Sequence, residues 1–209
     1  MDQETAEYIV RTAEHLASLF GETGPTSIKK EIPFVHPYYA AMIAASPFAV
    51  LATSGPGGLD ASPRGDPPGF VVAEDETTLL MPERRGNNRA DSLRNIVSDP
   101  RVALLFFIPG VGETLRVNGR ASISIAPAVL DRFVVQGKAP TCVLIVKVET
   151  VFFQCARAIQ RSRLWQPASP DARKGLPTPG AILAALSDAE IDGEKYDREL
   201  PDRQRATLY

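Results

Sequence analysis

The chain has 209 residues, of which 44% are hydrophobic and 23% charged, and its formal net charge is −2. This is the composition of a globular protein with one domain and terminal additions, and its charge argues against binding nucleic acid or an anionic membrane through bulk electrostatics. An acidic first segment, no apolar run of membrane-spanning length and only two cysteines predict a cytoplasmic protein without a disulfide framework.

Helical patterns come first along the chain. Apolar residues at helical spacing predict an amphipathic helix over residues 3–20, which Gly21 ends. Residues 36–47 predict a short helix that Pro47 ends, and His36 is interpreted as its starting residue rather than as a catalytic base.

From residue 48 the pattern becomes that of strands. Turn signals at 55–58 and 75–76 predict two hairpins. Residues 101–110 are apolar enough for a strand buried on both faces, and residues 114–125 alternate between apolar and polar side chains. A further long strand is predicted over 142–154. About six strands with few helices between them predict a mainly β, α+β fold built on an antiparallel barrel.

Arginines crowd the start of a helix predicted over residues 88–98. Asn88 is the predicted N-cap, Arg85 precedes it, Arg89 lies in the first turn and Ser92 lies one turn above the cap. A helix N-terminus carries partial positive charge, so guanidiniums are unfavourable there unless an anion sits among them. Two interpretations stay open: a phosphate site, or a solvated basic turn that neighbouring acids partly neutralise.

Two other stretches carry polar groups that a barrel does not require. The glycines and prolines of residues 60–70 place Arg64 and Asp66 at the rim of a strand, either at a site or as a surface pair. Arg116 and Asn118 lie on the polar face of an alternating strand.

The only tryptophan, Trp165, follows three arginines, and an aromatic ring beside guanidiniums can stack on a flat conjugated ligand. A helix end packed on the barrel explains the same pattern. Taken together, the arginine-rich stretches favour a ligand with a phosphate tail and a planar aromatic head. Phosphate-loop, dinucleotide-binding and zinc-site motifs are absent, so no metal is predicted.

Four stretches resemble the pyridoxamine 5′-phosphate oxidase-like flavoproteins, the FMN-binding split-barrel superfamily. They are residues 46–71, 79–110, 113–123 and 152–165, and the match covers roughly 35–166. The resemblance implies a six-stranded antiparallel Greek-key split barrel and a homodimer with FMN at the subunit interface. It also implies three regions: an N-terminal helical extension (1–34), the FMN-binding domain (35–166) and a C-terminal helical tail (167–209).

The resemblance further implies a role for each site residue. The residues that would hold the FMN phosphate are Arg85, Asn88, Arg89 and Ser92. Those that would line the flavin are Arg64, Gly65 and Asp66, with Arg116 and Asn118 facing it across the interface. Those that would come from the partner subunit are Arg161, Ser162 and Trp165.

The function implied is that of an FMN-dependent oxidoreductase acting on a small molecule, whose identity the sequence does not indicate. Relatives often carry His-Cys-Ala-Lys where this chain has Gln154-Cys155-Ala156-Arg157, and no residue is assigned to catalysis. Two alternatives stay open: a flavin-binding or sensing module without turnover, and the same fold using the deazaflavin F420 or haem.

Overall fold

The computed structural model describes residues 8–169 and 171–209. The chain divides into two units, Met1–Glu31 and Ile32–Tyr209. The limits predicted for the three regions of the chain stay predictions. None of the described helices is long and apolar enough to cross a membrane.

The first unit contains the helices α2 (Ala13–Leu19) and α3 (Pro25–Lys29). The Thr12 hydroxyl caps α2 by accepting a hydrogen bond of 3.1 Å from the backbone N–H of His15. The helix predicted over 3–20 is therefore wrong for residues 8–12, which precede the first helical residue, Ala13, while its first residues lie outside the described part of the chain.

The second unit holds the strands and the remaining helices. Its strands are β1 (Phe48–Gly55), β2 (Gly58–Gly65), β3 (Val72–Asp75), β4 (Thr78–Glu83), β5 (Arg101–Phe107), β6 (Thr114–Ser124) and β7 (Cys142–Gln154). Its helices are α4 (Pro37–Ala45), α5 (Asp91–Ser98), α6 (Pro127–Leu130), the 3₁₀ helix η1 (Asp131–Phe133), α7 (Arg157–Ser162), α8 (Pro179–Leu186) and α9 (Gly193–Ala206).

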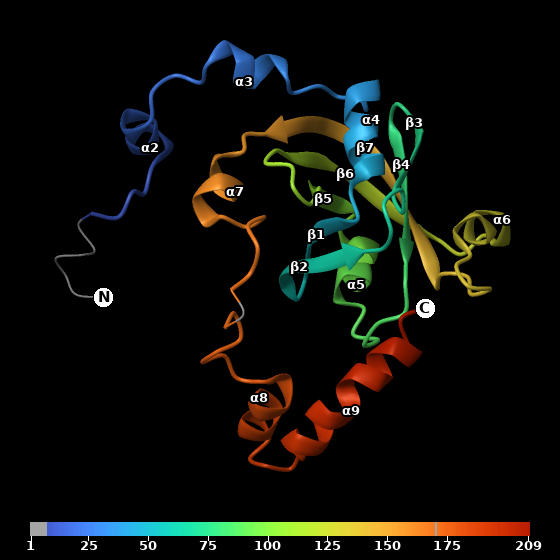
Figure 1. The fold of residues 1–209 in the computed structure, drawn as a ribbon. Coiled ribbons are helices and arrows are strands. Elements are labelled where there is room, and N and C mark those ends of the chain that lie inside the picture. The colour runs from blue at the N-terminus through green and yellow to red at the C-terminus, as the bar shows by residue number, and fades with distance from the viewer. Residues whose placement is uncertain (1–7, 170) are drawn as a thin grey trace. The chain divides into compact units, whose positions relative to one another are not determined.

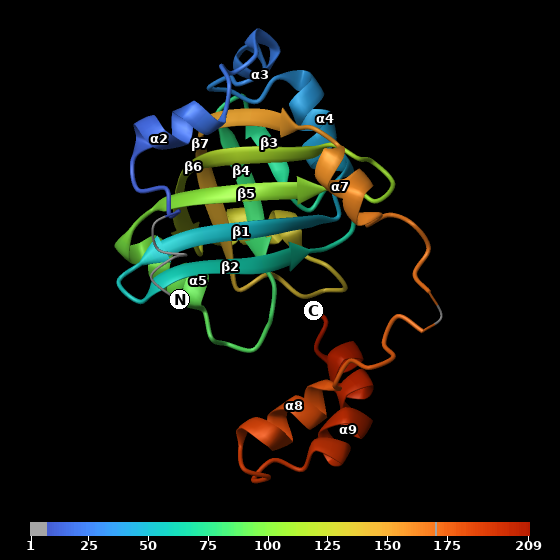
Figure 2. The same cartoon turned by 90° about the vertical axis from the view of Figure 1, so that its left-hand side faces the viewer.

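All seven strands form one antiparallel sheet in the order β2-β1-β5-β6-β7-β4-β3 (Figure 2). The predicted α+β class with an antiparallel sheet is confirmed. The sheet has seven strands where about six were predicted. Both predicted hairpins are confirmed, because β1 pairs with β2 and β3 pairs with β4. In the turn of the first, Gly58 has the left-handed conformation (φ 110°) that the turn requires.

The helix predicted after His36 is confirmed as α4. The His36 ring accepts a hydrogen bond of 3.2 Å from the backbone N–H of Tyr38, and Pro37 occupies the first helical position. His36 is thus a capping residue, as its position before proline indicates.

The main core consists of buried strand residues together with Ile43 of α4 and Ile96 of α5. Strand β6 buries Leu115 and Val117 and exposes Arg116, as its alternation predicts. Strand β5 also alternates: Leu104 is fully buried while Leu105 is half-buried, so the prediction of a strand buried on both faces is wrong. An apolar run by itself does not separate these two cases.

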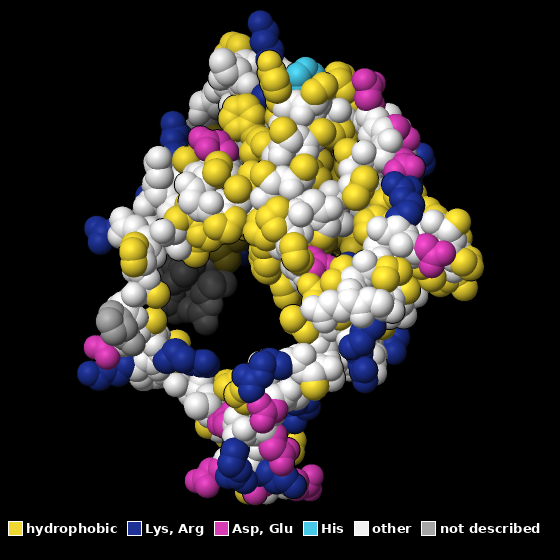
Figure 3. Space-filling model, turned by 45° about the vertical axis from the view of Figure 1, so that its right-hand side comes forward, with side chains coloured by type: hydrophobic (Ala, Val, Ile, Leu, Met, Phe, Trp, Pro, Cys, Tyr) yellow, Lys and Arg dark blue, Asp and Glu magenta, His cyan; other side chains and the backbone are white. Residues whose placement is uncertain are grey.

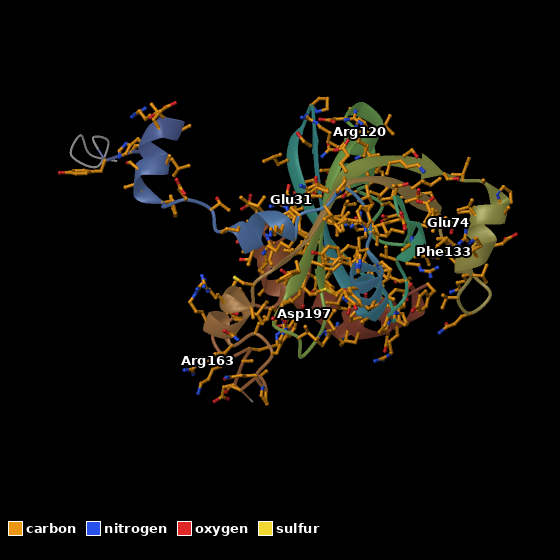
Figure 4. The ribbon with its side chains drawn as sticks, turned by 90° about the horizontal axis from the view of Figure 1, so that it is seen from above. Glu31, Glu74, Arg120, Phe133, Arg163 and Asp197 are labelled. Carbon is orange, nitrogen blue, oxygen red and sulfur yellow. The ribbon has the colours of Figure 1, made fainter. Side chains whose placement is uncertain are left out.

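The segment of α6 and η1 is attached to the sheet by apolar and polar contacts: Phe133 is buried against Leu80 and Val143. Arg132, in η1, forms a hydrogen bond of 3.0 Å with Glu74 of β3, and Figure 4 shows Glu74 and Phe133 close together there. Helices α8 and α9 lie side by side as a hairpin (Figure 1), fastened by a hydrogen bond of 2.7 Å from the Gly180 N–H to the Asp197 carboxylate.

Candidate functional site

Two ion pairs join the end of β2 to the end of β4. β2 is one edge strand of the sheet, and β4 lies next to the other edge strand, β3. Arg64 Nε lies 2.8 Å from Glu83 Oε2, and Arg84 Nε lies 2.7 Å from Asp66 Oδ2. β2 and β4 are separated by four strands in the strand order, so the sheet must curl for these pairs to form. We call this junction, from β2 to residues 82–93, the seam.

A cavity of about 740 Å³ opens along the seam. Its walls come from residues 60 and 62–66, from the whole of residues 82–93, and from Phe70, Thr141, Leu208 and Tyr209. The period-2 geometry of β2 explains part of the first wall, because Asp60, Ser62 and Arg64 point to the same side of the strand. A cavity of this volume lies in the usual range for small-molecule sites.

The loop between β4 and α5 forms the basic side of the cavity. Within the described residues no hydrogen bond or ion pair engages the side chains of Arg85 and Asn88, and both line the cavity. Arg89 is 78% exposed and pairs with Asp91 at 2.8 Å. Asn88 (φ 61°) and Ala90 (φ 54°) are left-handed, a strained conformation that is enriched at functional sites.

The helix α5 begins at Asp91, not at residue 88. The residue at the N-cap position is Ala90, which offers no side-chain cap, so the prediction that Asn88 is the N-cap is wrong. The left-handed residues in the loop prevent an earlier start. Arg89 therefore precedes the helix instead of lying in its first turn, while Ser92 lies in that turn.

Asp60 is the main site residue that sequence reasoning missed. Its carboxylate accepts hydrogen bonds from Ser92 (2.5 Å) and Ser62 (2.8 Å), and the first of these lowers the pKa of Asp60 most. Arg64 donates to the same Ser92 hydroxyl at 3.3 Å. The Ser92 hydroxyl thus donates its hydrogen bond to a carboxylate of the protein itself. The alternating polar residues of β2 were the signal that could have indicated this cluster.

We expect Asp60→Asn to lower the free energy of unfolding by about 1 kcal/mol at neutral pH, because two charge-assisted hydrogen bonds become neutral. The folded-state pKa of Asp60 lies below its ordinary value of 3.8, so this contribution is present above that pH and is lost as the pH falls through the folded-state pKa. Urea unfolding at neutral pH and below pH 3.8 should show the difference between the two proteins shrinking in acid. Asp171→Asn, in an exposed segment, is the control, and a difference that stays constant with pH contradicts the prediction.

The remaining predicted site residues lie away from this cavity. Arg116 and Asn118 are on the outer face of β6, with Arg116 Nε 3.3 Å from Asn118 Oδ1. The Trp165 indole N–H donates to the Val111 carbonyl at 2.6 Å. The two others, Arg161 and Ser162, are exposed at the end of α7 and do not line the cavity.

The structure therefore brings together seven of the predicted residues and leaves five apart. Those around the cavity are Arg64, Gly65, Asp66, Arg85, Asn88, Arg89 and Ser92. Those outside it are Arg116, Asn118, Arg161, Ser162 and Trp165. A single chain does not bring these two groups together at one cavity.

Arg84 has a different role from its two neighbours in the basic stretch. It pairs with Asp66, donates to the Phe133 carbonyl at 2.7 Å, and its guanidinium carbon lies 5.5 Å from the centre of the Tyr209 ring. Asp66 is only 3% exposed, and its second oxygen accepts a hydrogen bond of 2.7 Å from the Tyr209 hydroxyl. Arg84 and Asp66 thus hold the site together, and no sequence signal indicated Tyr209.

The cavity walls carry charged groups of both signs: four arginines (Arg64, Arg84, Arg85 and Arg89) and four carboxylates (Asp60, Asp66, Glu83 and Asp91), with the amides of Asn87 and Asn88. Of these four guanidiniums only that of Arg85 has no carboxylate partner among the described residues. Neither histidine lines the cavity. Burial raises the pKa of the nearby Cys142 thiol to about 11, so this thiol stays protonated at neutral pH. Among the described residues, no three side chains of the metal-binding types lie close enough to hold a metal ion. The side chains present can bind and orient an anionic ligand.

Comparison with known proteins places the chain in a family. The sequence profile of the family described as "Pyridoxamine 5'-phosphate oxidase" matches residues 35–155, more than half of the chain. The match spans both β2 and the loop before α5, the two sides of the cavity. No curated protein matches this chain.

Several solved structures match this chain over part of its length. HupZ from Group A Streptococcus is 18% identical, with 57% of this chain and 94% of that chain covered and a TM-score of 0.47. A candidate pyridoxamine 5′-phosphate oxidase from Lactobacillus delbrueckii is 18% identical (58% and 99% covered, TM-score 0.44). An FMN-binding protein from Syntrophomonas wolfei is 13% identical (54% and 80% covered, TM-score 0.42). These similarities are too low to transfer a function, and the assignment depends on the family profile: the chain belongs to the pyridoxamine 5′-phosphate oxidase family.

Proposed function

We propose that the chain binds FMN in the seam cavity and is an FMN-dependent oxidoreductase acting on a small-molecule substrate. One observation carries the proposal: in a chain of this family, the cavity of about 740 Å³ is bordered by a loop whose Arg85 and Asn88 side chains have no partner among the described residues. A guanidinium and an amide left free beside a cavity suit a phosphate group.

The phosphate is proposed to lie against the loop 85–90. Arg85 and Asn88 are available there, and Arg89 can turn from its exposed pair with Asp91, because exposed pairs of this kind contribute little. The Ser92 hydroxyl is less suitable, because it already donates to the Asp60 carboxylate, and a phosphate placed there would lie next to that negative charge. Of the four residues predicted to hold the phosphate, Arg85, Asn88 and Arg89 are therefore proposed to contact it directly.

Arg64 is proposed to face the conjugated part of the ligand. Its guanidinium is held by Glu83 and Ser92, so its position in the cavity wall is set before any ligand arrives. A fixed positive group stabilises negative charge that develops on a ligand nearby. FMN, when bound, supplies hydride or electron transfer, while the protein orients the cofactor and excludes water.

We also propose that the protein is a homodimer, as the resemblance implies. The observation in its favour is that Arg116, Asn118 and Trp165 lie outside the cavity of their own chain, so only a second copy could bring them to it. The outer face of the sheet suits such contact, because it carries apolar surface. Leu105 of β5, which pairs with Arg116, is only half-buried there and could be covered by a second copy. Sedimentation velocity distinguishes a 22.6 kDa monomer from its dimer.

The absorption spectrum of the purified protein tests the cofactor. FMN, a deazaflavin and haem absorb differently, so the spectrum decides between the proposal and the two alternative cofactors. If the protein is purified without cofactor, titration with FMN, followed by quenching of flavin fluorescence, should show saturable binding. A colourless protein that does not bind added FMN overturns the proposal. Reduction of the bound flavin by NAD(P)H and its reoxidation by an acceptor separate an enzyme from a binding or sensing module.

A further inference from the structure

Tyr209 lines the seam cavity although it lies far from β2 in sequence. Its hydroxyl donates to Asp66 Oδ1 at 2.7 Å, and its main-chain oxygen accepts a hydrogen bond of 2.7 Å from Lys138 Nζ. Together with the Arg84 guanidinium over its ring, three contacts fix this one side chain and its backbone. The hydrogen bond to Asp66 also raises the pKa of the Tyr209 phenol, so the hydroxyl stays protonated and donates at neutral pH.

The Tyr209 ring forms a wall without filling the cavity. With Tyr209 in place the cavity still has a volume of about 740 Å³. Tyr209 also lines a neighbouring hollow of about 420 Å³, whose other walls include Lys138 and Thr141. Removing the ring would join the two spaces and admit water beside Arg84 and Arg85, which line both.

Tyr209 is carried by the α8–α9 hairpin. The two helices approach closely where Gly180 faces Gly193, since a Cβ on Gly180 would collide with the Gly193 carbonyl oxygen. The Asp192 carboxylate caps α9 at 2.9 Å from the Lys195 N–H. Figure 3 shows charged side chains of both signs over this hairpin. Among the described residues, the chain from α8 onward forms hydrogen bonds with the sheet and the loops between its strands only through Tyr209.

We propose that Tyr209 is a ligand-binding residue of the seam cavity, which contacts a planar aromatic ligand, and that ligand binding is coupled to docking of the α8–α9 hairpin. The inference rests on the proposed function for the identity of the ligand. A ligand that touches both the loop 85–90 and Tyr209 binds the docked form more tightly than the undocked form. By thermodynamic linkage the ligand then stabilises docking, and docking strengthens ligand binding to the same extent.

The test compares full-length wild-type protein with Tyr209→Ala, Tyr209→Phe and the control Tyr38→Ala, whose ring is exposed on α4 and does not line the cavity. We expect Tyr209→Ala to raise the Kd for FMN about tenfold and Tyr209→Phe, which keeps the ring but loses the hydroxyl, about threefold. Tyr38→Ala should bind as wild type does. Hydrogen exchange across residues 179–206 should slow when FMN is added to wild type and should not respond to FMN in Tyr209→Ala.

Exchange of β5 and β6 serves as the folding control, because these strands should be equally protected in all four proteins. Equal or tighter FMN binding by Tyr209→Ala, or faster hairpin exchange with FMN, overturns the inference while leaving the proposed function intact. If wild type binds no FMN, the proposed function and the ligand coupling both fail. Whether Tyr209 docks the hairpin is then tested by hydrogen exchange of residues 179–206 without ligand. This exchange should be faster in Tyr209→Ala than in wild type.

Discussion

Replacing Arg85 and Arg89 together with alanine is expected to weaken FMN binding by on the order of 100-fold. Each guanidinium can give a phosphate one or more charge-assisted hydrogen bonds, and each such bond contributes about 1.5–3 kcal/mol. Arg85 has no partner to lose among the described residues, and Arg89 loses only an exposed pair. The fold should therefore be unaffected, and fluorescence titration with FMN should report the change directly.

The matched control is Arg173→Ala with Lys174→Ala, which removes the same charge from exposed positions that lie outside the α8–α9 hairpin and do not line the cavity. It should leave the Kd within about twofold of wild type at moderate salt, because neither side chain lines the cavity and salt screens exposed charges. Equal losses in both double variants would mean that bulk charge, and not the loop, attracts the ligand. Full affinity in Arg85→Ala with Arg89→Ala would refute the phosphate assignment.

A single methyl group at Gly119 is expected to cost about 3 kcal/mol of unfolding free energy. Gly119 lies at an irregularity between β6 and β7, where Asn118 pairs with Thr150 but Gly119 pairs with Val148. β7 therefore carries one extra residue, Glu149, as in a β-bulge. A Cβ on Gly119 would collide with the Lys147 carbonyl oxygen, which is backbone and cannot rotate away.

Urea unfolding of Gly119→Ala measures this cost. Gly57→Ala is the control, because a Cβ there meets no atom within 4 Å and the residue lies in the exposed turn between β1 and β2. A stability of Gly119→Ala within about 0.5 kcal/mol of wild type would show that β7 can move aside and that the close approach is not required.

Local patterns predicted the elements of this protein well because the forces behind them are local. Alternation over 114–125 follows from the two-residue period of a strand, and the structure buries Leu115 and Val117 as that period requires. The turn at 55–58 follows from the conformational freedom of glycine. The helix over 88–98 was predicted with the wrong first residue, because its start depends on left-handed residues that no sequence pattern indicated.

Which charged residues form ion pairs with each other was much harder to predict. Arg64 and Asp66 are two residues apart, and a surface pair between them was one open interpretation. In the structure each pairs instead with a residue of the opposite strand end, Glu83 and Arg84. The same stretch, 82–93, therefore contains one arginine that joins the two ends of the sheet and two that face the cavity.

The sequence by itself thus determined the class of fold, most of the strands and the basic loop 85–90, since periodicity, turn residues and charge are properties of short segments. Only the tertiary structure decided that Asp60 engages Ser92, that Arg84 is bound to Asp66, and that Tyr209 lines the cavity and bonds to Asp66. Those contacts join segments as many as 143 residues apart. They depend on the curvature of the sheet and the path of the chain after it, which no local pattern specifies.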